Sequence, residues 1–415
     1  MPPKTTPPRQ GPRPLTLHMT VQWLTTLGSL AALPPSRNGS PPSRPSSPAW
    51  PADLTEALKA ADPDRLARAV AAEAWGRTRR FADGVLAYRH HPHRRTLETP
   101  PVLWSAGTTR LLDYGTTAEA SAAGPPVLVV PSLINRYHIL DLTADRSLLR
   151  YLAARGLRPF VVDWDAPGPE EEGFDVAAYI TRRLEPALDA VTAETGRTPA
   201  VAGYCMGGTL AAGLAARRPD GVAALATLAA PWDFHAAAPE HARLLAEVFR
   251  VWDTFLPPGW PLPVDAIQAL FALVDPQAVP AKFRRFADRA DNGRAARHFV
   301  ALEDWLNDGV PLARPVAREC LTGWYGANTP GRGAWHVAGT PVHPETLACP
   351  ALALVPRGDR LVPPESARAL TDRAPRPRME SIPAGHIGMI AGARARGRVY
   401  WPLARWLRGR LRKTA

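Results

Sequence analysis

The sequence predicts an α/β protein in which helices cover both faces of a mostly parallel sheet. Short apolar runs alternate with helical patterns from about residue 101 onward. One of these runs ends in a glycine-rich turn that leads directly into a helix of small residues, at 203–216. The alternation stops near residue 235 and resumes near residue 346. Because parallel strands need a crossover between them, this order indicates one sheet interrupted by a helical insertion.

The strands are expected where apolar runs are bounded by proline, glycine or charged residues. They are residues 127–130, 159–163, 199–203, 222–228, 351–355 and 379–382. Between them, residues 145–155 show an amphipathic pattern with leucines on one face. A longer helix with apolar residues from 176 to 191 is expected to end at Gly196, since glycine commonly terminates helices.

Charge and composition divide the 415 residues into five segments. Residues 1–52 contain no Asp or Glu and many of the 47 prolines, which predicts a disordered tail. We expect a helical segment at 53–100, the first part of the core at 101–234, a helical cap at 235–345 and the second part at 346–415. The net charge of +12 is concentrated at the two ends, and residues 394–415 also lack acids. The nearly neutral body therefore argues against a nucleic-acid-binding protein.

Cysteine and histidine spacing favours a cytoplasmic protein without a structural metal. The three cysteines form no CxxC pair, and an odd number without a secretory leader indicates a reducing compartment. Residues 15–33 are mildly apolar but too polar to predict a transmembrane span. His90, His91 and His93 alternate with arginines, and we interpret this run as an exposed basic loop rather than a metal cluster.

The chemistry is expected at residues 203–208, which read Gly-Tyr-Cys-Met-Gly-Gly. This matches the G-x-S-x-G nucleophile elbow with cysteine in place of serine, between a strand and a helix. The turn places Cys205 at a helix N-terminus, where backbone amides and the helix dipole favour a thiolate. The pattern predicts that Cys205 is a nucleophile.

An elbow requires an acid and then a histidine further along the chain. Asp359 follows the strand at 351–355, and His386 follows the last strand between small residues. We predict that His386 is the base and that Asp359 fixes its tautomer. Asp233 is an alternative acid, and His138 and His235 are alternative bases near strand ends.

The oxyanion hole is expected to combine the amide of Met206 with that of Leu133, with Ser132 as the alternative donor. A cysteine nucleophile keeps the acyl group as a thioester, so that it can pass to another acceptor. The elbow therefore favours acyl transfer from a thioester donor, and hydrolysis is the alternative where water reaches the acyl-enzyme.

The chain resembles the polyhydroxyalkanoate synthase family, which has the α/β-hydrolase fold. The resemblance is carried by the following stretches: Gly107-Thr-Thr-Arg-Leu-Leu-Asp-Tyr114, Val130-Pro-Ser-Leu-Ile-Asn-Arg-Tyr137, Gly203-Tyr-Cys-Met-Gly-Gly-Thr-Leu210, Phe299-Val-Ala-Leu-Glu-Asp-Trp305 and Gly385-His-Ile-Gly388. The last two look like the shorter synthases that act with a helical partner subunit.

This resemblance implies that Cys205 accepts the acyl group, with His386 as base and Asp359 as acid. It implies a 3-hydroxyacyl-coenzyme A substrate, a polyester product and free coenzyme A, with no further cofactor. A granule surface, a second copy of the chain and a helical subunit are the expected partners. A thioesterase or polyester hydrolase using the same three residues is the alternative. The basic C-terminal segment is expected to pack on the sheet as the closing helix, and binding to a lipid or polymer surface is the alternative.

Overall fold

The computed structural model describes residues 9–32, 52–117, 120–289, 291 and 293–412. The chain forms two compact units, each built from segments distant in sequence. Unit 1 comprises residues 1–93 and 271–307, and unit 2 comprises residues 94–270 and 308–415. In the described ranges no helix is long and apolar enough to cross a lipid bilayer.

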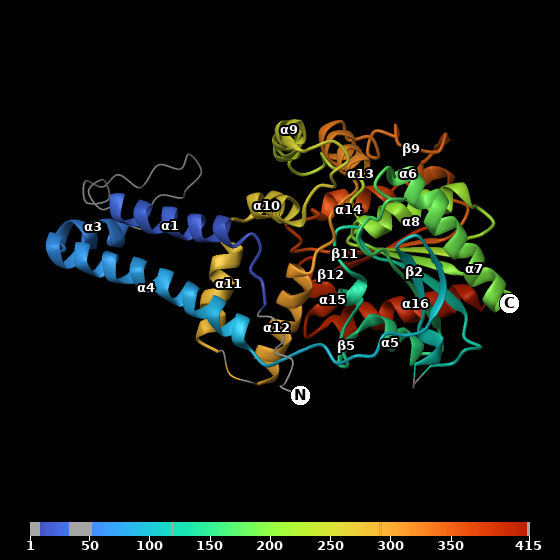
Figure 1. Ribbon diagram of the computed structural model, residues 1–415, viewed down its shortest axis with the longest axis horizontal. Helices are drawn as coiled ribbons and strands as arrows, with labels where there is room; N and C mark the ends of the chain where they lie inside the picture. The colour runs from blue at the N-terminus through green and yellow to red at the C-terminus, as the bar shows by residue number, and fades with distance from the viewer. Residues whose placement is uncertain (1–8, 33–51, 118–119, 290, 292, 413–415) are drawn as a thin grey trace. The chain divides into compact units, whose positions relative to one another are not determined.

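Unit 2 is built on an eight-stranded sheet of order β1-β2-β6-β3-β7-β8-β11-β12 (Figure 1). Its strands are β1 Val102–Ala106, β2 Thr109–Asp113, β3 Pro126–Val130, β6 Arg158–Asp163, β7 Ala200–Tyr204, β8 Ala224–Leu228, β11 Ala351–Pro356 and β12 Pro377–Ile382. Strand β2 runs antiparallel to both of its neighbours, and the other pairs are parallel. The prediction of a mostly parallel sheet is confirmed, and each of the six predicted strands overlaps an observed one.

Helices cover both faces of this sheet. In Figure 1, α5 and α16 lie on one side of the strands, and α7 and α8 lie on the other. The helices of unit 2 include α5 Leu148–Ala153, α6 Val176–Tyr179, η3 Ile180–Leu184, α7 Glu185–Thr195, α8 Met206–Arg217, α9 Pro239–Phe255, α13 Arg314–Arg318, η4 Glu319–Gly326, α14 Pro364–Thr371, α15 Gly388–Ala391, η6 Arg396–Tyr400 and α16 Trp401–Leu411. The strands β3, β6, β7, β8 and β11 are buried at every position, as a doubly covered parallel sheet requires.

Smaller elements complete unit 2. They are the turns η1 Tyr114–Thr116, η2 Tyr137–Leu140 and η5 Pro344–Thr346, and the two-residue or three-residue strands β4 Asp141–Thr143, β5 Arg146–Ser147, β9 His336–Val337 and β10 Thr340–Pro341. The predicted stop at Gly196 is observed, because this glycine caps α7 with φ at 63°. Closing helix α16 buries Leu403, Leu407 and Leu411, which places its apolar side in the core.

Unit 1 is helical. It contains α1 Leu15–Ala31, α3 Ala52–Ala60, α4 Pro63–His90, α11 Ala278–Ala287 and α12 Arg294–Asn307, and helix α10 Val264–Val274 spans the boundary with unit 2. Its core joins Phe81, Val85 and Tyr88 of α4 to Phe283 and Phe286 of α11. Helices α4 and α11 approach closely, since a Cβ on Gly84 would come within 2.1 Å of the Phe283 carbonyl oxygen.

The prediction of a disordered tail over 1–52 is wrong for residues 15–31, which form α1. Two polar residues of this stretch, Gln22 and Thr26, are buried against α4. Gln22 Nε2 donates to Thr78 Oγ1 at 3.2 Å, and Thr26 Oγ1 lies 2.8 Å from the same hydroxyl. Residues 1–8 and 33–51 of the predicted tail lie outside the described residues.

Two further expectations need correction. The insertion at 235–345 is not one cap, because α11 and α12 belong to unit 1, where the aromatic face of α11 completes the core around α4. The histidine run is not a fully exposed loop either. His91 is 5% exposed, and its Nε2 lies 3.2 Å from the carbonyl oxygen of Asp291.

Candidate active site

The backbone at Cys205 has the geometry of a nucleophile elbow. Cys205 lies between β7 and α8 with φ at 54° and ψ at −133°, a conformation that non-glycine residues rarely adopt. A Cβ on Gly207 would come within 2.1 Å of the Val130 carbonyl oxygen, and one on Gly203 within 2.3 Å of the Gly207 carbonyl oxygen. The two glycines therefore allow the turn to close tightly on its neighbours, and they leave Cys205 half-buried at the start of a helix.

His386 and Asp359 lie on the loops that follow the last two strands of the sheet. His386 Nδ1 lies 2.7 Å from Asp359 Oδ2, and the Asp359 side chain is fully buried. The other carboxylate oxygen accepts hydrogen bonds from the amides of Leu361 and Val362, each at 2.9 Å. These backbone contacts fix the carboxylate, which in turn holds the imidazole with Nδ1 as the donor and leaves Nε2 for the nucleophile.

The electrostatics of His386 indicate that it interacts directly with Cys205. Burial by itself lowers the pKa of His386, whose side chain is only 9% exposed. The charge of Cys205, hydrogen bonds to Asp359 and Cys205, and the charge of Asp359 outweigh burial and raise the pKa to about 10. A histidine with this pKa is protonated at neutral pH. The arrangement therefore places a protonated imidazole in direct contact with the sulfur of Cys205.

Apolar side chains surround Cys205, and an aromatic ring lies beside His386. Cys205 packs on the cluster formed by Ala353, Val355, Val362 and Ala367. The Tyr204 hydroxyl donates to the His386 carbonyl oxygen at 3.2 Å, and the two rings lie 5.2 Å apart. These contacts hold the loop that carries His386 against the end of β7.

The segment that follows β3 is fixed beside the elbow. The indole nitrogen of Trp164 donates to the Pro131 carbonyl oxygen at 3.1 Å, and the Val310 amide donates to the Ile134 carbonyl oxygen at 3.0 Å. Leu133 and Ser132, the two alternative donors, lie between these anchor points, and both are buried. Met206 is the first residue of α8, so its amide has no acceptor within the helix. Its role and that of Leu133 in an oxyanion hole remain predictions.

The structure places the alternative acid and bases in other contacts. Asp233 Oδ1 accepts hydrogen bonds from Asn328 Nδ2 at 2.8 Å and from the His235 amide at 2.9 Å. His235 Nε2 lies 2.8 Å from the Tyr325 carbonyl oxygen. Burial, together with the charge of Arg95, lowers the pKa of His138 to about 4. The carboxylate that His386 contacts is that of Asp359.

Tyr325 is a site residue that sequence reasoning missed. Burial, followed by the charge of Cys205, raises the pKa of the Tyr325 hydroxyl, which indicates that the phenol lies near the sulfur. Tyr325 belongs to η4 in the insertion, and its ring lies 4.9 Å from that of Phe234. No motif surrounds it, so the sequence carried no signal for it. Tyr204, by contrast, immediately precedes Cys205 within the elbow motif, so its position in the sequence already indicates that it lies near the site.

No group of histidine, cysteine or acidic residues in the described part of the chain is arranged to hold a metal ion.

Comparison with known proteins identifies the fold family. The family model described as "alpha/beta hydrolase fold" matches residues 125–393, which is more than half of the chain. The chain belongs to this family. The match begins just before β3 and ends beyond His386, so it includes the elbow and both loops that carry Asp359 and His386.

Curated relatives of this α/β-hydrolase-fold chain confirm its resemblance to the polyhydroxyalkanoate synthases. A poly(3-hydroxyalkanoate) polymerase subunit PhaC from Haloferax mediterranei is 30% identical over 74% of this chain and 63% of its own length. A subunit of the same name from Haloarcula marismortui is 28% identical over 74% of this chain and 67% of its own length. The one from Thiocystis violacea is 26% identical over 72% of this chain and 85% of its own length. The chain thus spans about two thirds of the length of the haloarchaeal relatives.

Proposed function

We propose that this α/β-hydrolase-fold protein is an acyltransferase that polymerises 3-hydroxyacyl groups from coenzyme A thioesters into a polyester. The observation that carries the proposal is the elbow cysteine whose charge raises the pKa of His386, which is itself held at 2.7 Å by Asp359. The relatives that are named as poly(3-hydroxyalkanoate) polymerase subunits support the same reaction class.

In the proposed first step, the Cys205 thiolate attacks the thioester carbonyl carbon and forms a carbon–sulfur bond. The negative charge develops on the carbonyl oxygen, where the amides of Met206 and Leu133 are the expected donors. When the tetrahedral intermediate collapses, the bond to the coenzyme A sulfur breaks. The leaving thiolate takes the proton from His386, and free coenzyme A departs from a Cys205 thioester.

In the proposed second step, neutral His386 accepts the proton from the hydroxyl of another 3-hydroxyacyl-coenzyme A. The hydroxyl oxygen attacks the acyl-enzyme carbonyl, the carbon–sulfur bond breaks and an ester bond forms. Cys205 leaves as a thiolate beside the protonated imidazole, which restores the starting pair. Asp359 keeps the imidazole oriented in both steps, because Nδ1 remains bonded to a carboxylate.

The test is incubation with 3-hydroxybutyryl-coenzyme A, with free thiol, Cys205 adduct and products measured together. The proposal predicts an acyl adduct on Cys205 and recovery of polymer. Cys205→Ala should abolish thiol release, and Cys349→Ala, which removes another buried cysteine, should retain it. Asp359→Asn should lower the acylation rate by about 10³–10⁴-fold, by analogy with other triads.

The products distinguish the two reactions that this site supports. Thiol release that yields only soluble 3-hydroxybutyrate would show that water, not a hydroxyacyl group, accepts the acyl chain. The protein would then be a thioesterase that uses the same residues. Thiol release that persists in Cys205→Ala would contradict both polymerisation and hydrolysis through Cys205.

A further inference from the structure

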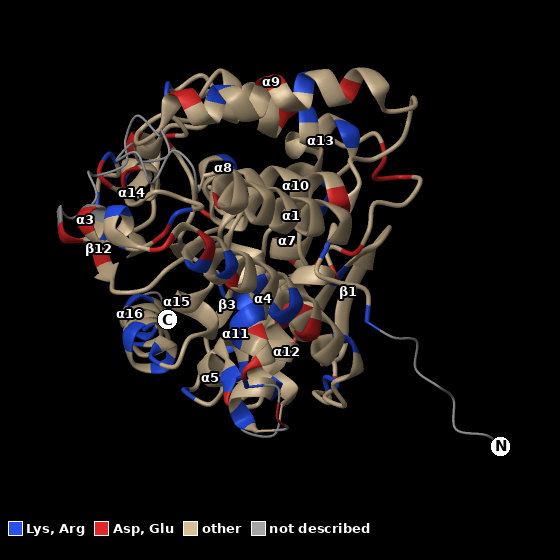
Figure 2. Ribbon diagram, turned by 90° about the vertical axis from the view of Figure 1, so that its left-hand side faces the viewer, with Lys and Arg blue, Asp and Glu red and all other residues tan. Residues whose placement is uncertain are grey.

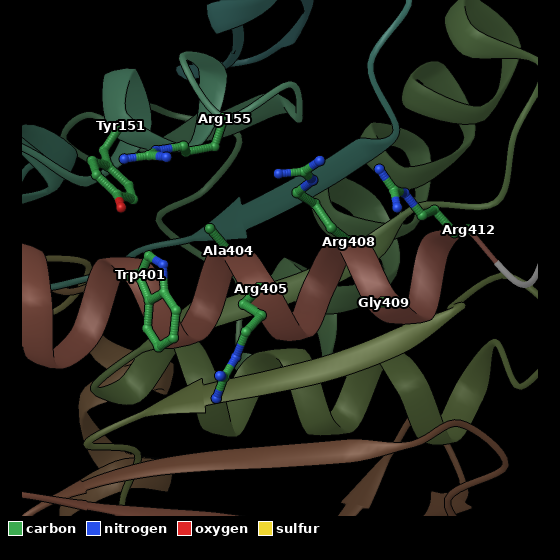
Figure 3. Close-up of a pocket in the computed structure, with 8 residues that line it drawn as sticks. All are labelled: Tyr151, Arg155, Trp401, Ala404, Arg405, Arg408, Gly409 and Arg412. Atoms are coloured by element: carbon green, nitrogen blue, oxygen red, sulfur yellow. The ribbon is translucent and has the colours of Figure 1, made fainter.

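A second candidate site lies in unit 2 beside the closing helix α16. A cavity of about 260 Å³ opens there, and its lining is rich in arginine (Figure 3). Its lining residues are Tyr151, Arg155, Trp401, Ala404, Arg405, Arg408, Gly409 and Arg412. A water molecule takes about 30 Å³ in the liquid. The cavity therefore has room for a group much larger than one solvent molecule.

The positive charge at this cavity has no neutralising partner in the part of the chain that the structure describes. The salt bridges there include none to Arg155, Arg405, Arg408 or Arg412. The sequence from residue 381 to the C-terminus contains no Asp or Glu. Basic positions recur along α16 (Figure 2). Like charges three or four residues apart on a helix repel one another, so this arrangement costs stability unless an anion is bound.

The side chains at the cavity converge from two elements. Arg408 and Arg412 leave α16 on the side where Arg155 and Tyr151 lie, and Arg405 points to the opposite side (Figure 3). The Arg155 guanidinium lies 5.1 Å from the centre of the Tyr151 ring, which fixes it at one end of the cavity. Ala404 and Gly409 have small side chains or none, and they leave the space open.

The helix dipole does not fully explain this cluster. Cations are favoured at the C-terminal end of a helix, which accounts for basic residues in the last turns of α16. It gives no reason for Arg155, which follows α5, to line the same cavity. It also gives no reason for the half-exposed Trp401, against which Arg405 lies at 4.3 Å from the ring centre.

The cavity is distinct from the proposed catalytic residues. Arg155 lies just before the amino end of β6. The carbonyl of Leu411 accepts a hydrogen bond at 3.2 Å from Arg197, which precedes the amino end of β7. Cys205, Asp359 and His386 all follow the carboxyl ends of their strands. The C-terminal end of α16 therefore lies near the amino ends of the strands, whereas the elbow lies at their carboxyl ends.

From these observations we infer that the cavity beside α16 binds a ligand with two or more linked phosphates. Guanidinium groups match phosphate geometry with two parallel hydrogen bonds, and three of them line one side of this space. Arg408 and Arg412 are four residues apart on α16, where Cβ atoms lie about 5–6 Å apart, so that both guanidiniums can reach one short chain of linked phosphates. The phosphates belong either to a nucleoside di- or triphosphate, with Trp401 available to stack on a base, or to an inorganic oligophosphate.

The experiment is calorimetric titration of the full chain with ATP and, separately, with inorganic tripolyphosphate at about 0.15 M salt. The test variant is Arg408→Gln with Arg412→Gln. The matched control is Arg394→Gln with Arg398→Gln, which removes the same charge from exposed positions of the same basic segment outside the cavity. Arg155→Gln, on the other element, serves as a second test variant in case the α16 variant does not fold.

We expect saturable binding that the test variants weaken about tenfold or more, and that the control leaves unchanged. If the natural ligand is a nucleotide, Trp401→Ala should weaken the binding of ATP but not that of tripolyphosphate. If it is an inorganic oligophosphate, this variant should leave the binding of both unchanged. Equal weakening in test and control variants would overturn the proposal in favour of general attraction between charges. Absence of saturable binding would overturn it as well. So would binding confined to anionic phospholipid vesicles or to duplex DNA, tested in parallel.

Discussion

At the scale of single residues, the site depends on a buried histidine that stays charged. Burial disfavours an imidazolium, yet the pKa of His386 is raised to about 10 by Cys205 and Asp359. The sequence could supply the three residues, because an elbow fixes the order of nucleophile, acid and base along the chain. It could not supply Tyr325, whose position near the sulfur depends on how the insertion folds.

The first prediction concerns the charge of Cys205. In Cys205→Ala the pKa of His386 should fall, because burial remains while the charge interaction and the hydrogen bond with Cys205 are lost. The measurement is an NMR titration of the histidine ring in both proteins. The same titration of His386 in Cys349→Ala, which removes a different cysteine, serves as the control and should match the native protein. An unchanged His386 titration would show that the sulfur does not hold the proton on the imidazole.

The same shift predicts how stability depends on pH. The folded-state pKa of about 10 lies above the unfolded value of 6.5, so folding is favoured by protonation of His386. This contribution is complete below about pH 6.5 and is lost as the pH rises toward 10. The free energy of unfolding, measured by urea titration, should therefore decrease more between pH 7 and 10 in the native protein than in His386→Gln. Parallel pH profiles for the two proteins would contradict the raised pKa.

A further prediction at this scale concerns Gly207. In Gly207→Ala the new Cβ would overlap the carbonyl oxygens of Val130 and Pro131, at 2.1 and 2.6 Å. The elbow and the segment with Leu133 must then separate, and the acylation rate should fall by about 10²-fold or more if an oxyanion donor moves away. Gly397→Ala is the matched control, since a Cβ there meets nothing within 4 Å. Circular dichroism distinguishes lost activity from lost folding. Normal acylation by folded Gly207→Ala would show that the close contact is dispensable.

At the scale of elements, the pattern of apolar residues in the sequence correctly predicts the strands of the sheet but does not predict helix α1. The five parallel strands that are buried at every position are rich in apolar residues, so they stand out in the sequence. Helix α1 instead buries His18, Gln22 and Thr26 and exposes Trp23, Leu24 and Leu27. Gln22 and Thr26 find their partners on α4 and α11, because both contact the Thr78 hydroxyl and Gln22 Oε1 also accepts from Arg284 at 2.8 Å. A rule that places apolar faces inside cannot predict such a helix from the sequence.

An element-scale prediction concerns Asp141, which joins four segments of unit 2. Its buried carboxylate accepts hydrogen bonds from Tyr114 at 2.8 Å, Arg150 at 2.9 Å and Arg95 at 3.0 Å. Asp141→Asn removes the charge that these two guanidiniums share and should lower the free energy of unfolding by about 2–4 kcal/mol. Asp372→Asn breaks an exposed pair with Arg368 and should cost about 0.5 kcal/mol or less. Equal losses in urea titrations of the two variants would contradict the role assigned to the buried network.

At the scale of the whole molecule, each compact unit combines segments that are distant in the sequence. The alternation of strands and helices correctly predicted the sheet and the interruption after residue 234. It could not predict that residues 271–307 join the N-terminal helices, because that pairing depends on contacts between aromatic side chains about 200 residues apart. Phe283 lies 6.3 Å from Phe81 and 5.7 Å from Tyr88, ring centre to ring centre. Aromatic residues at helical spacing do not identify their partner.

The division into two units predicts that one can be destabilised without the other. Phe283→Ala removes a fully buried ring from the core of unit 1 and should cost about 3–5 kcal/mol there. Hydrogen exchange measured by mass spectrometry should then become faster in α1, α4, α11 and α12, while β3, β7 and β11 keep their protection. Phe255→Ala, at a ring that is 80% exposed, should change neither set. If exchange instead rises equally across the strands, the two units unfold as one cooperative body, and the elbow at Cys205 depends on the aromatic core of the N-terminal helices.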